Sequence, residues 1–430
     1  MYLRATLASM KILIHQAHII DLQSPHHGTI NDILIEDGII KKIQSSLNDN
    51  ADIDIEHKNL HISIGWLDIF SNFCDPGYEY KESLISGANA AAAGGYTDVF
   101  VIPNTKPAID TKSQIEYIIQ KSKTLPANIF PIGAITKNID GKELAEMYDM
   151  QNSGAIAFSD GMNPVQSAGL LLKALQYIKA FDGVIIQIPD DKSVGASGLI
   201  NEGIISTKLG LPGKPIIAEE LIIERDIKLT EYTESKIHFT GITSARSLEH
   251  IKRAKDKGLN VTCSITPYHL FFCDEDLLDY DTNLKVYPPL RTKTGISELK
   301  NAVIDGTIDC IASHHLPHEY DSKILEFEYA KFGMTGLETS YSVIKTIFPQ
   351  MKEEKIISLL SNNPRKIFGL DQFSISAGSK SRITLFDPAG PFILKEENIR
   401  SKSKNTPFIN KQLQGKVIGI VNGEKVFLNN

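Results

Sequence analysis

Cysteine is scarce in this sequence, and its spacing excludes two classes of small protein. The 430 residues include four cysteines, Cys74, Cys263, Cys273 and Cys310, and no pair has the Cys-x-x-Cys spacing of a metal knuckle. Four cysteines spread over so long a chain are also too few for a disulfide framework. Free thiols are typical of a reducing compartment, so we expect a cytoplasmic protein.

Net positive charge and long apolar runs are lacking as well. The formal net charge is −7 at pH 7 and the pI is near 6.0, whereas binders of nucleic acids or anionic membranes present a basic surface. No apolar run approaches the roughly 18 residues of a membrane-spanning helix. We therefore expect no nucleic-acid partner and no membrane association. Residues 1–9 lack the apolar core of a signal peptide, and we interpret them as an extension or a misassigned start.

Histidine is missing from the middle of the chain. Six of the twelve histidines lie at or before His61 and six at or after His238, so the stretch between Ile62 and Ile237 has none. Imidazole is the commonest protein ligand of catalytic metals and a frequent general base. Any such chemistry would therefore have to draw its histidines from the two ends of the chain.

Both ends show the alternation of apolar and polar residues that is typical of β-strands. Strands are predicted over 11–20, 29–35 and 39–43, and again over 382–386, 416–421 and 425–428, with hairpin signals at Asp37-Gly38 and Asn422-Gly423. Neither end is large enough to bury a core alone. We therefore expect residues 10–63 and 372–430 to pair into one small β domain.

Between these ends, residues 64–371 alternate short apolar runs with helical patterns. Eight strands are predicted, over 66–68, 96–103, 128–134, 154–158, 184–188, 236–240, 260–266 and 308–312, and helices over 83–93, 113–122, 168–180, 244–257 and 337–347. Eight β/α units over about 300 residues favour a (β/α)₈ TIM barrel, an α/β fold, and no GxGxxG motif follows the first strand. In such a barrel the chemistry lies at the carboxyl ends of the strands.

Several motifs in this region resemble one known family. They are Asp75-Pro-Gly-Tyr-Glu-Tyr-Lys-Glu82, Ile102-Pro-Asn-Thr-Lys-Pro107, Val261-Thr-Cys-Ser-Ile-Thr-Pro-Tyr-His269, Pro288-Pro-Leu-Arg291, Phe332-Gly-Met-Thr-Gly-Leu-Glu-Thr339 and Asn363-Pro-Arg-Lys-Ile-Phe-Gly-Leu370. The chain is similar along these motifs to dihydroorotases of the long, multifunctional-complex type, in the amidohydrolase superfamily. The resemblance implies a barrel flanked by a small β domain, and a place in pyrimidine biosynthesis.

The resemblance also implies a reaction and a metal site. The family closes N-carbamoyl-L-aspartate reversibly to dihydroorotate, with a zinc-bound hydroxide as nucleophile and a carboxylate as proton shuttle. In this sequence the positions of the family's metal ligands are all substituted, and they read Phe70, Asn72, Gly161, Gln187, Gly241 and His314. Phenylalanine and glycine offer no donor atom, and amides bind zinc poorly. We therefore expect no metal, no cofactor and no intact catalytic residue.

The substrate-binding positions are altered in part. Asn104 and His318 match the family, whereas its carboxylate-binding Arg is Cys74 here and its Asn before Pro-Pro-Leu-Arg is Tyr287. A neutral Asn and one His cannot replace a bidentate Arg for gripping a carboxylate. We expect Trp66, Phe70, Phe73 and Tyr287 to fill the volume of the lost metals and substrate.

Other residues could in principle form a new site. His314 and His318 have metal-ligand spacing, but His315 and His318 already occur in the family and only His314 is new. We interpret Asp160 as a solvated turn or helix-cap carboxylate, Cys74 as a small buried thiol, and His238 and His269 as structural.

Two functions follow from these observations. The first is a catalytically silent dihydroorotase-like protein with a structural or regulatory role, which we expect to be a homo-oligomer and for which the family suggests aspartate carbamoyltransferase as a partner. The alternative is an active dihydroorotase or related cyclic amidohydrolase with a rebuilt site. A dihydropyrimidinase is less compatible with the sequence, because no lysine lies near the end of the fourth strand.

Overall fold

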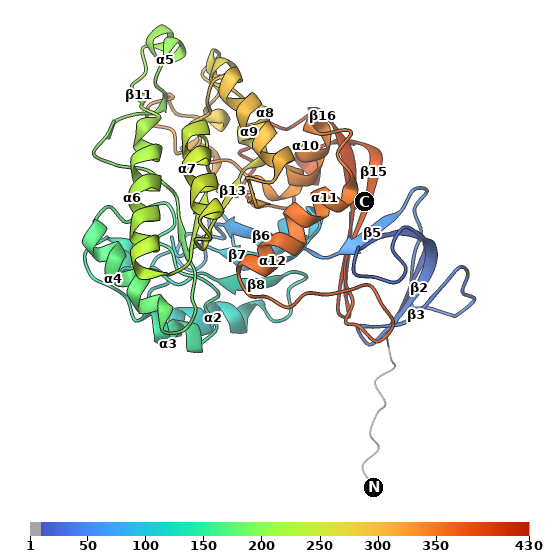
Figure 1. Cartoon of the computed structure of the whole chain (residues 1–430). Helices are drawn as coiled ribbons and strands as arrows, with labels where there is room; N and C mark the ends of the chain where they lie inside the picture. Colours follow the sequence, from blue (N-terminus) through green and yellow to red (C-terminus); the bar gives the residue numbers. More distant parts are fainter. Residues whose placement is uncertain (1–9, 430) are drawn as a thin grey trace.

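The computed structural model describes residues 10–429, so the prediction about residues 1–9 lies outside the described residues. The two chain ends form one sheet with the strand order β17-β16-β15-β5-β1-β2-β3, and β4 pairs with β1. Its strands are β1 (Lys11–Ile20), β2 (Ile30–Glu36), β3 (Ile39–Gln44), β4 (Ile53–Ile55), β5 (His61–Ile64), β15 (Arg382–Ile393), β16 (Gln412–Asn422) and β17 (Lys425–Leu428). In Figure 1 this sheet lies on one side of the molecule, with the blue and red ends of the chain together.

The remaining chain forms a closed barrel of parallel strands. These are β6 (Trp66–Ser71), β7 (Tyr96–Val101), β8 (Asn128–Pro131), β9 (Ile185–Gln187), β12 (Ile237–Thr240), β13 (Val261–Ile265) and β14 (Cys310–Ile311). Single bridges complete the ring, because Phe158 pairs with both Gly133 and Ile185, and Ser71 pairs with His315. A short side sheet of β10 (Ile200–Asn201) and β11 (Gly213–Lys214) stands beside the barrel.

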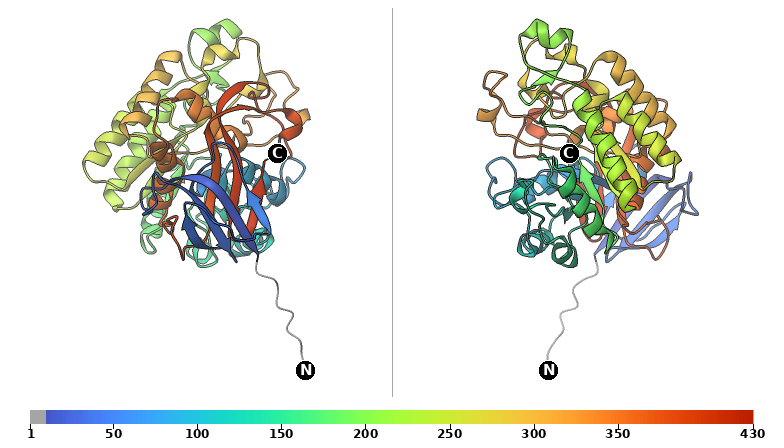
Figure 2. Two further views of the ribbon diagram at one scale, coloured as in Figure 1. Left: turned by 90° about the vertical axis from the view of Figure 1, so that its right-hand side faces the viewer. Right: turned by 60° about the vertical axis from the view of Figure 1, so that its left-hand side comes forward.

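Helices cover the outside of the barrel, as the two turned views in Figure 2 show. The α-helices are α1 (Leu84–Ala93), α2 (Lys112–Ser122), α3 (Met147–Asn152), α4 (Ala168–Lys179), α5 (Ile204–Leu209), α6 (Ile217–Thr233), α7 (Ala245–Asp256), α8 (Pro267–Phe271), α9 (Lys293–Asp305), α10 (Ser340–Ile347), α11 (Glu353–Ile357) and α12 (Asn363–Ile367). Short 3-10 turns occur at Lys137–Ile139, Asp274–Leu277, Thr282–Leu284, Tyr320–Ser322, Leu337–Thr339 and Glu396–Asn398, and a π-helical segment at Ser358–Asn362 joins α11 to α12.

The helices begin where the sequence supplies N-caps. The Ser83 hydroxyl accepts a hydrogen bond from the Ser86 backbone N–H at the start of α1, and Ser244 does the same for Ser247 at the start of α7. Each such cap is worth about 1 kcal/mol. The face of α7 that packs on the barrel carries Leu248, Ile251 and Ala254, all buried.

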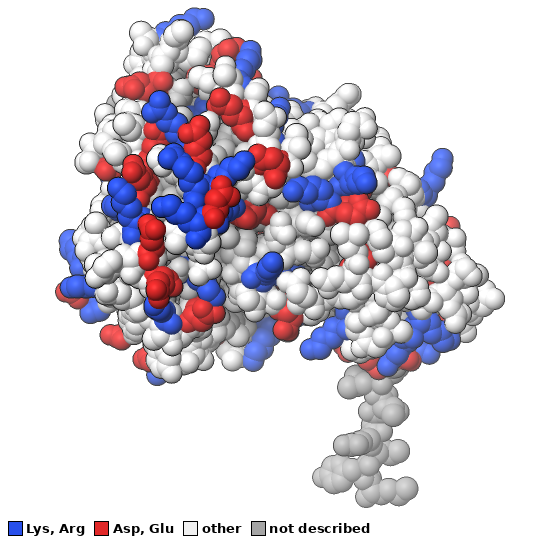
Figure 3. All heavy atoms as spheres, in the orientation of Figure 1, with Lys and Arg blue, Asp and Glu red and all other residues white. Residues whose placement is uncertain are grey.

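The surface agrees with the composition. Lys and Arg side chains are interspersed with Asp and Glu over α6 and α7 in Figure 3, with no broad field of one sign on that face. In the part of the chain between residues 10 and 429, no helix is long and apolar enough to cross a membrane.

The fold class predicted from the sequence is confirmed, with one strand reduced. The predicted fourth strand over 154–158 is reduced to two bridges at Phe158, to Gly133 and to Ile185, and Gly154 lies in the turn after α3 at φ +108°. The first three residues of the helix predicted over 337–347 form a 3-10 turn instead. The division into residues 10–63 with 372–430 and residues 64–371 stays a prediction.

Candidate functional site

The carboxyl ends of the barrel strands open onto a cavity of about 470 Å³. It is lined by Asn72, Met162, Asp190, Lys192, Ala196, Gly198, Lys214, Tyr287, Pro289, Leu316, His318 and Phe332. Its walls combine apolar side chains with a few charged and polar groups, the usual make-up of a small-molecule site. The residues singled out from the sequence lie around this mouth or directly beneath it.

Beneath the mouth, an aromatic pair occupies two of the substituted ligand positions. The Phe70 ring at the end of β6 lies 4.5 Å from the ring of His314, centroid to centroid. Both side chains are completely buried. The His314 Nε2 atom is 2.7 Å from the Thr240 hydroxyl oxygen, and its Nδ1 atom has no partner within the described residues. Burial, reinforced by His269 and His238, holds the pKa of His314 well below its usual value, so the ring is neutral.

Gly161 and Gly241 are two of the positions that the resemblance assigns to metal ligands, and a neighbouring side chain lies close to each of them. Gly161 adopts φ +58°, and a Cβ there would lie 1.7 Å from the amide oxygen of Asn104. Gly241 adopts φ +75°, and its Cβ would lie 2.8 Å from Cε1 of His314. Left-handed backbone of this kind favours glycine. A side chain at either position would therefore require Asn104 or His314 to shift.

The two amide side chains among these positions are engaged in local structure. The Asn72 Oδ1 atom accepts a hydrogen bond of 2.8 Å from the Cys74 backbone N–H, which closes an Asx turn. Cys74 itself adopts φ +59°. The Gln187 amide bonds to the backbone of Val165 and, at 3.3 Å, to the carboxylate of Asp226 on α6. The Asn72 amide thus braces the loop after β6, and the Gln187 amide links β9 to the segment before α4 and to α6.

The donor set does not fit zinc. Phe70, Gly161 and Gly241 supply no donor atom, both amides are engaged elsewhere, and His314 is the one imidazole among the six positions. Three or four nitrogen, sulfur or carboxylate ligands are needed for a zinc site. Across residues 10–429, no three His, Cys, Asp or Glu side chains lie close enough together to hold a metal ion.

The predicted substrate-binding positions are divided in their placement. His318 and Tyr287 line the cavity. Asn104 lies beneath Met162, and its Oδ1 atom accepts a hydrogen bond of 3.1 Å from the Met162 backbone N–H. Cys74 is buried, and burial raises the pKa of its thiol to about 12, so it is not a thiolate nucleophile. The structure does not bring these four residues together on one ligand-sized surface.

The His318 ring is neutral and fixed in one tautomer. Its Nε2 atom lies 2.9 Å from the backbone carbonyl of Phe332, so Nε2 carries the proton and donates it. Burial, with the nearby Lys81, lowers the pKa of His318 to about 4. The Nδ1 atom therefore bears a lone pair, and it has no partner in the described part of the chain.

Three interpretations made from the sequence were wrong. Asp160 is buried rather than solvated, and its carboxylate accepts hydrogen bonds of 2.9 Å from the backbone N–H groups of Ile135 and Thr136. Burial raises the pKa of Asp160 to about 6. Trp66 lies at the other end of β6 from the mouth, against Tyr96, Tyr341 and Phe386, and Phe73 packs on Gly87 of α1. Phe70 and Tyr287 do lie at the mouth.

The remaining histidines behave as structural residues. His238 bonds through both ring nitrogens, to the hydroxyl groups of Thr262 and Ser264. His269 bonds to the Thr266 hydroxyl and to the Pro288 carbonyl. Burial lowers the pKa of each to about 3. Their placement agrees with the structural interpretation made from the sequence.

One group in the cavity was missed by the sequence reasoning. Asp190 pairs with the Lys214 ammonium group at 2.8 Å and accepts the Tyr287 hydroxyl at 2.6 Å, and both members of the ion pair are buried. Asp190 and Asp191 directly follow the fifth strand, which was an available signal. Lys214, on β11, could be placed there only by the tertiary structure.

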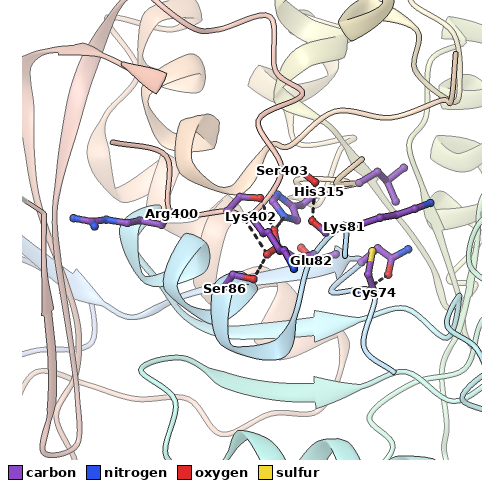
Figure 4. A network of polar contacts seen from close by, with 12 residues as sticks. Cys74, Lys81, Glu82, Ser86, His315, Arg400, Lys402 and Ser403 are labelled. Carbon is purple, nitrogen blue, oxygen red and sulfur yellow. Dashed lines mark hydrogen bonds and ion pairs between the residues drawn. The ribbon is translucent and has the colours of Figure 1, made fainter. Parts of the chain in front are cut away.

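A polar network ties the C-terminal part of the chain to the mouth loops (Figure 4). Buried Glu82 pairs with His315 and accepts hydrogen bonds from the hydroxyl groups of Ser86 and Ser401 and from the Lys402 backbone N–H. Asn405 bonds to the backbone of Leu316 and Gly333. Residues 400–405 therefore brace the loops after β6 and β14 without a metal.

The barrel with its flanking sheet is also found in solved structures of other proteins. It resembles an L-hydantoinase (dihydropyrimidinase) from Arthrobacter aurescens, with a TM-score of 0.81 and 21% identity over 97% of this chain and 96% of that one. A dihydropyrimidinase from Brevibacillus agri gives a TM-score of 0.82 at 19% identity over 98% of this chain and 95% of that one. At these identities the likeness shows the fold alone.

Sequence comparison identifies the family. A dihydro-orotase-like family model matches residues 61–247. A dihydroorotase from Geobacter metallireducens is 38% identical over 97% of this chain and 99% of its own length, and one from Thermoanaerobacter sp. is 39% identical over 91% and 92%. The chain belongs to the dihydroorotase family.

Proposed function

We propose that this chain is a catalytically silent member of the dihydroorotase family that serves pyrimidine biosynthesis in a structural or regulatory role. The observation that carries the proposal is the Phe70–His314 ring pair, which together with Gly161 and Gly241 leaves the metal-ligand positions without a usable donor set. The intact caps, turns and barrel closure support it further, because the fold is retained while the changes gather at the strand ends.

The missing ligands remove the source of the nucleophile. Zinc lowers the pKa of a bound water from 15.7 to about 7, which supplies hydroxide at neutral pH. His314 and His318 are weak bases because their pKa values are depressed, and the Asp160 carboxylate already accepts two backbone N–H groups. Attack on a ring amide is therefore not assisted.

Purified protein should neither hydrolyse dihydroorotate nor cyclise N-carbamoyl-L-aspartate above the uncatalysed rate, with or without added Zn²⁺ or Mn²⁺. Absorbance at the ring amide band and chromatography of the products measure both directions. Turnover near one per second that is lost in His314→Ala would overturn the proposal, because the activity would then depend on a rebuilt site.

A rebuilt cyclic amidohydrolase is the second candidate. The cavity of about 470 Å³ favours it, because space for a ligand persists beside Asp190, Lys214 and Tyr287. Against it, Asp190 is already satisfied by the lysine and the tyrosine, so no free base faces the cavity from that side. The same assay decides between the two candidates.

A structural role requires an interface, and we propose a homo-oligomer in the cytoplasm, with aspartate carbamoyltransferase as a heterologous partner. Symmetric association is the common arrangement among soluble proteins. Size-exclusion chromatography with light scattering, on the chain alone and after co-expression with that enzyme, tests both associations. A monomer that elutes independently of the carbamoyltransferase would contradict them.

A further inference from the structure

One loop beside the cavity has the composition of an anion-binding loop. Residues 192–198, between β9 and β10, read Lys-Ser-Val-Gly-Ala-Ser-Gly, and Lys192, Ala196 and Gly198 line the cavity. Gly195 adopts φ +63°. Across residues 10–429, the backbone N–H groups of Gly195, Ala196 and Ser197 bond to no protein acceptor. Consecutive free N–H groups around a left-handed residue form a concave donor surface for anions.

The charges at this side of the cavity leave one cation uncompensated. Asp190 is neutralised by Lys214 at 2.8 Å, and the Tyr287 hydroxyl occupies its other oxygen. Lys192 has only a neutral partner, the Asn163 amide oxygen at 3.3 Å. Asp191, the next carboxylate along the chain, accepts hydrogen bonds from the Ser193 backbone N–H and hydroxyl. Lys192 therefore lines the cavity with no carboxylate within ion-pair distance in the described part of the chain.

Another part of the cavity lining suits a flat ring. Tyr287 and Phe332 meet there as an aromatic corner with ring centroids 6.2 Å apart, and Met162 and Leu316 complete the apolar surface. A flat aromatic ring would match this apolar surface.

We propose that the cavity binds a small aromatic ring bearing a phosphate group, as in a nucleoside 5′-monophosphate. The ring lies against Tyr287 and Phe332, and the phosphate lies at Lys192 and the free N–H groups of residues 195–197. A phosphate fits this loop better than a carboxylate does, because its three terminal oxygens can accept from the ammonium group and several backbone N–H groups together. The inference rests on the proposed function, since a working hydrolase would need the same cavity for its own substrate.

Calorimetry on the full chain with uridine 5′-monophosphate, adenosine 5′-monophosphate, the two nucleosides and inorganic phosphate tests the proposal. We expect at least one nucleotide to bind at least about tenfold more tightly than its nucleoside and than phosphate alone, because different groups of the cavity hold the ring and the anion. Lys192→Ala should weaken nucleotide binding about tenfold and leave nucleoside binding unchanged, and Lys192→Arg should restore it in part.

Two further variants separate the ring from the phosphate. Tyr287→Leu should weaken the binding of nucleotide and nucleoside alike. Lys208 is an exposed lysine on α5 outside the cavity lining, so Lys208→Ala should change the affinity for neither ligand. Absence of nucleotide binding at millimolar concentration, or equal affinity of the wild type and Lys192→Ala, would overturn the inference. A finding of dihydroorotate turnover in the enzyme assay would instead defeat the proposed function, and the two failures are thus distinguishable.

Discussion

The double variant Phe70→His/Asn72→His should hydrolyse dihydroorotate no faster than the unaltered chain. It restores the His-x-His pair that the family uses after the first barrel strand, but Gly161, Gln187, Gly241 and His314 still supply neither the other ligands nor the acid–base carboxylate. We expect both proteins to be at least about 10⁶-fold slower than an intact family member, since the metal-activated water is missing from both.

Stability measurements keep this result interpretable. Phe70 is completely buried against His314, so the substitution removes an aromatic pair from the barrel interior, and circular dichroism with thermal unfolding must show that the variant is folded. A folded double variant with measurable zinc-dependent turnover would contradict the account, because two imidazoles would then suffice to rebuild the centre.

Restoring histidine at Gly241 should destabilise the protein strongly. Gly241→His places a side chain at φ +75° and brings its Cβ within 2.8 Å of His314, which must give up its hydrogen bond to Thr240. Backbone strain and displacement of a buried neighbour together should lower the free energy of unfolding by about 2–4 kcal/mol.

Gly258→His is the matched control for this substitution. Gly258 has nearly the same backbone conformation, φ +79°, but nothing lies within 4 Å of its Cβ position. It should therefore show only the backbone cost, about 1 kcal/mol. Denaturant unfolding of both variants measures the difference, and equal losses would mean that the space beside His314 is not closed to a ligand.

Much of the fold could be predicted from periodicity and turn residues. The hairpin at Asp37-Gly38, the caps at Ser83 and Ser244, and the alternation of strands with helices all specify local structure, and the structure follows them. The fourth barrel strand could not be judged in this way, because its length depends on how its neighbours pair with Phe158.

The candidate site was predictable position by position but not as a surface. The substitutions at Phe70 and Gly241 are visible in the sequence, whereas the contact of Phe70 with His314 joins residues from the first and last barrel strands. The burial of Asp160 and the pairing of Asp190 with Lys214 likewise depend on segments far apart in the chain. Trp66 was misplaced although it begins the first predicted barrel strand, because the direction of the chain already puts it at the amino end of the barrel, away from the mouth.

Zinc content is the most direct test of the central claim that this member of the family has lost its metal site. Protein purified from zinc-supplemented cells and dialysed against a chelator should carry well below one equivalent of zinc per chain by elemental analysis, because no suitable donor set exists at the mouth. Close to two equivalents retained after dialysis, and lost on His314→Ala, would contradict the account.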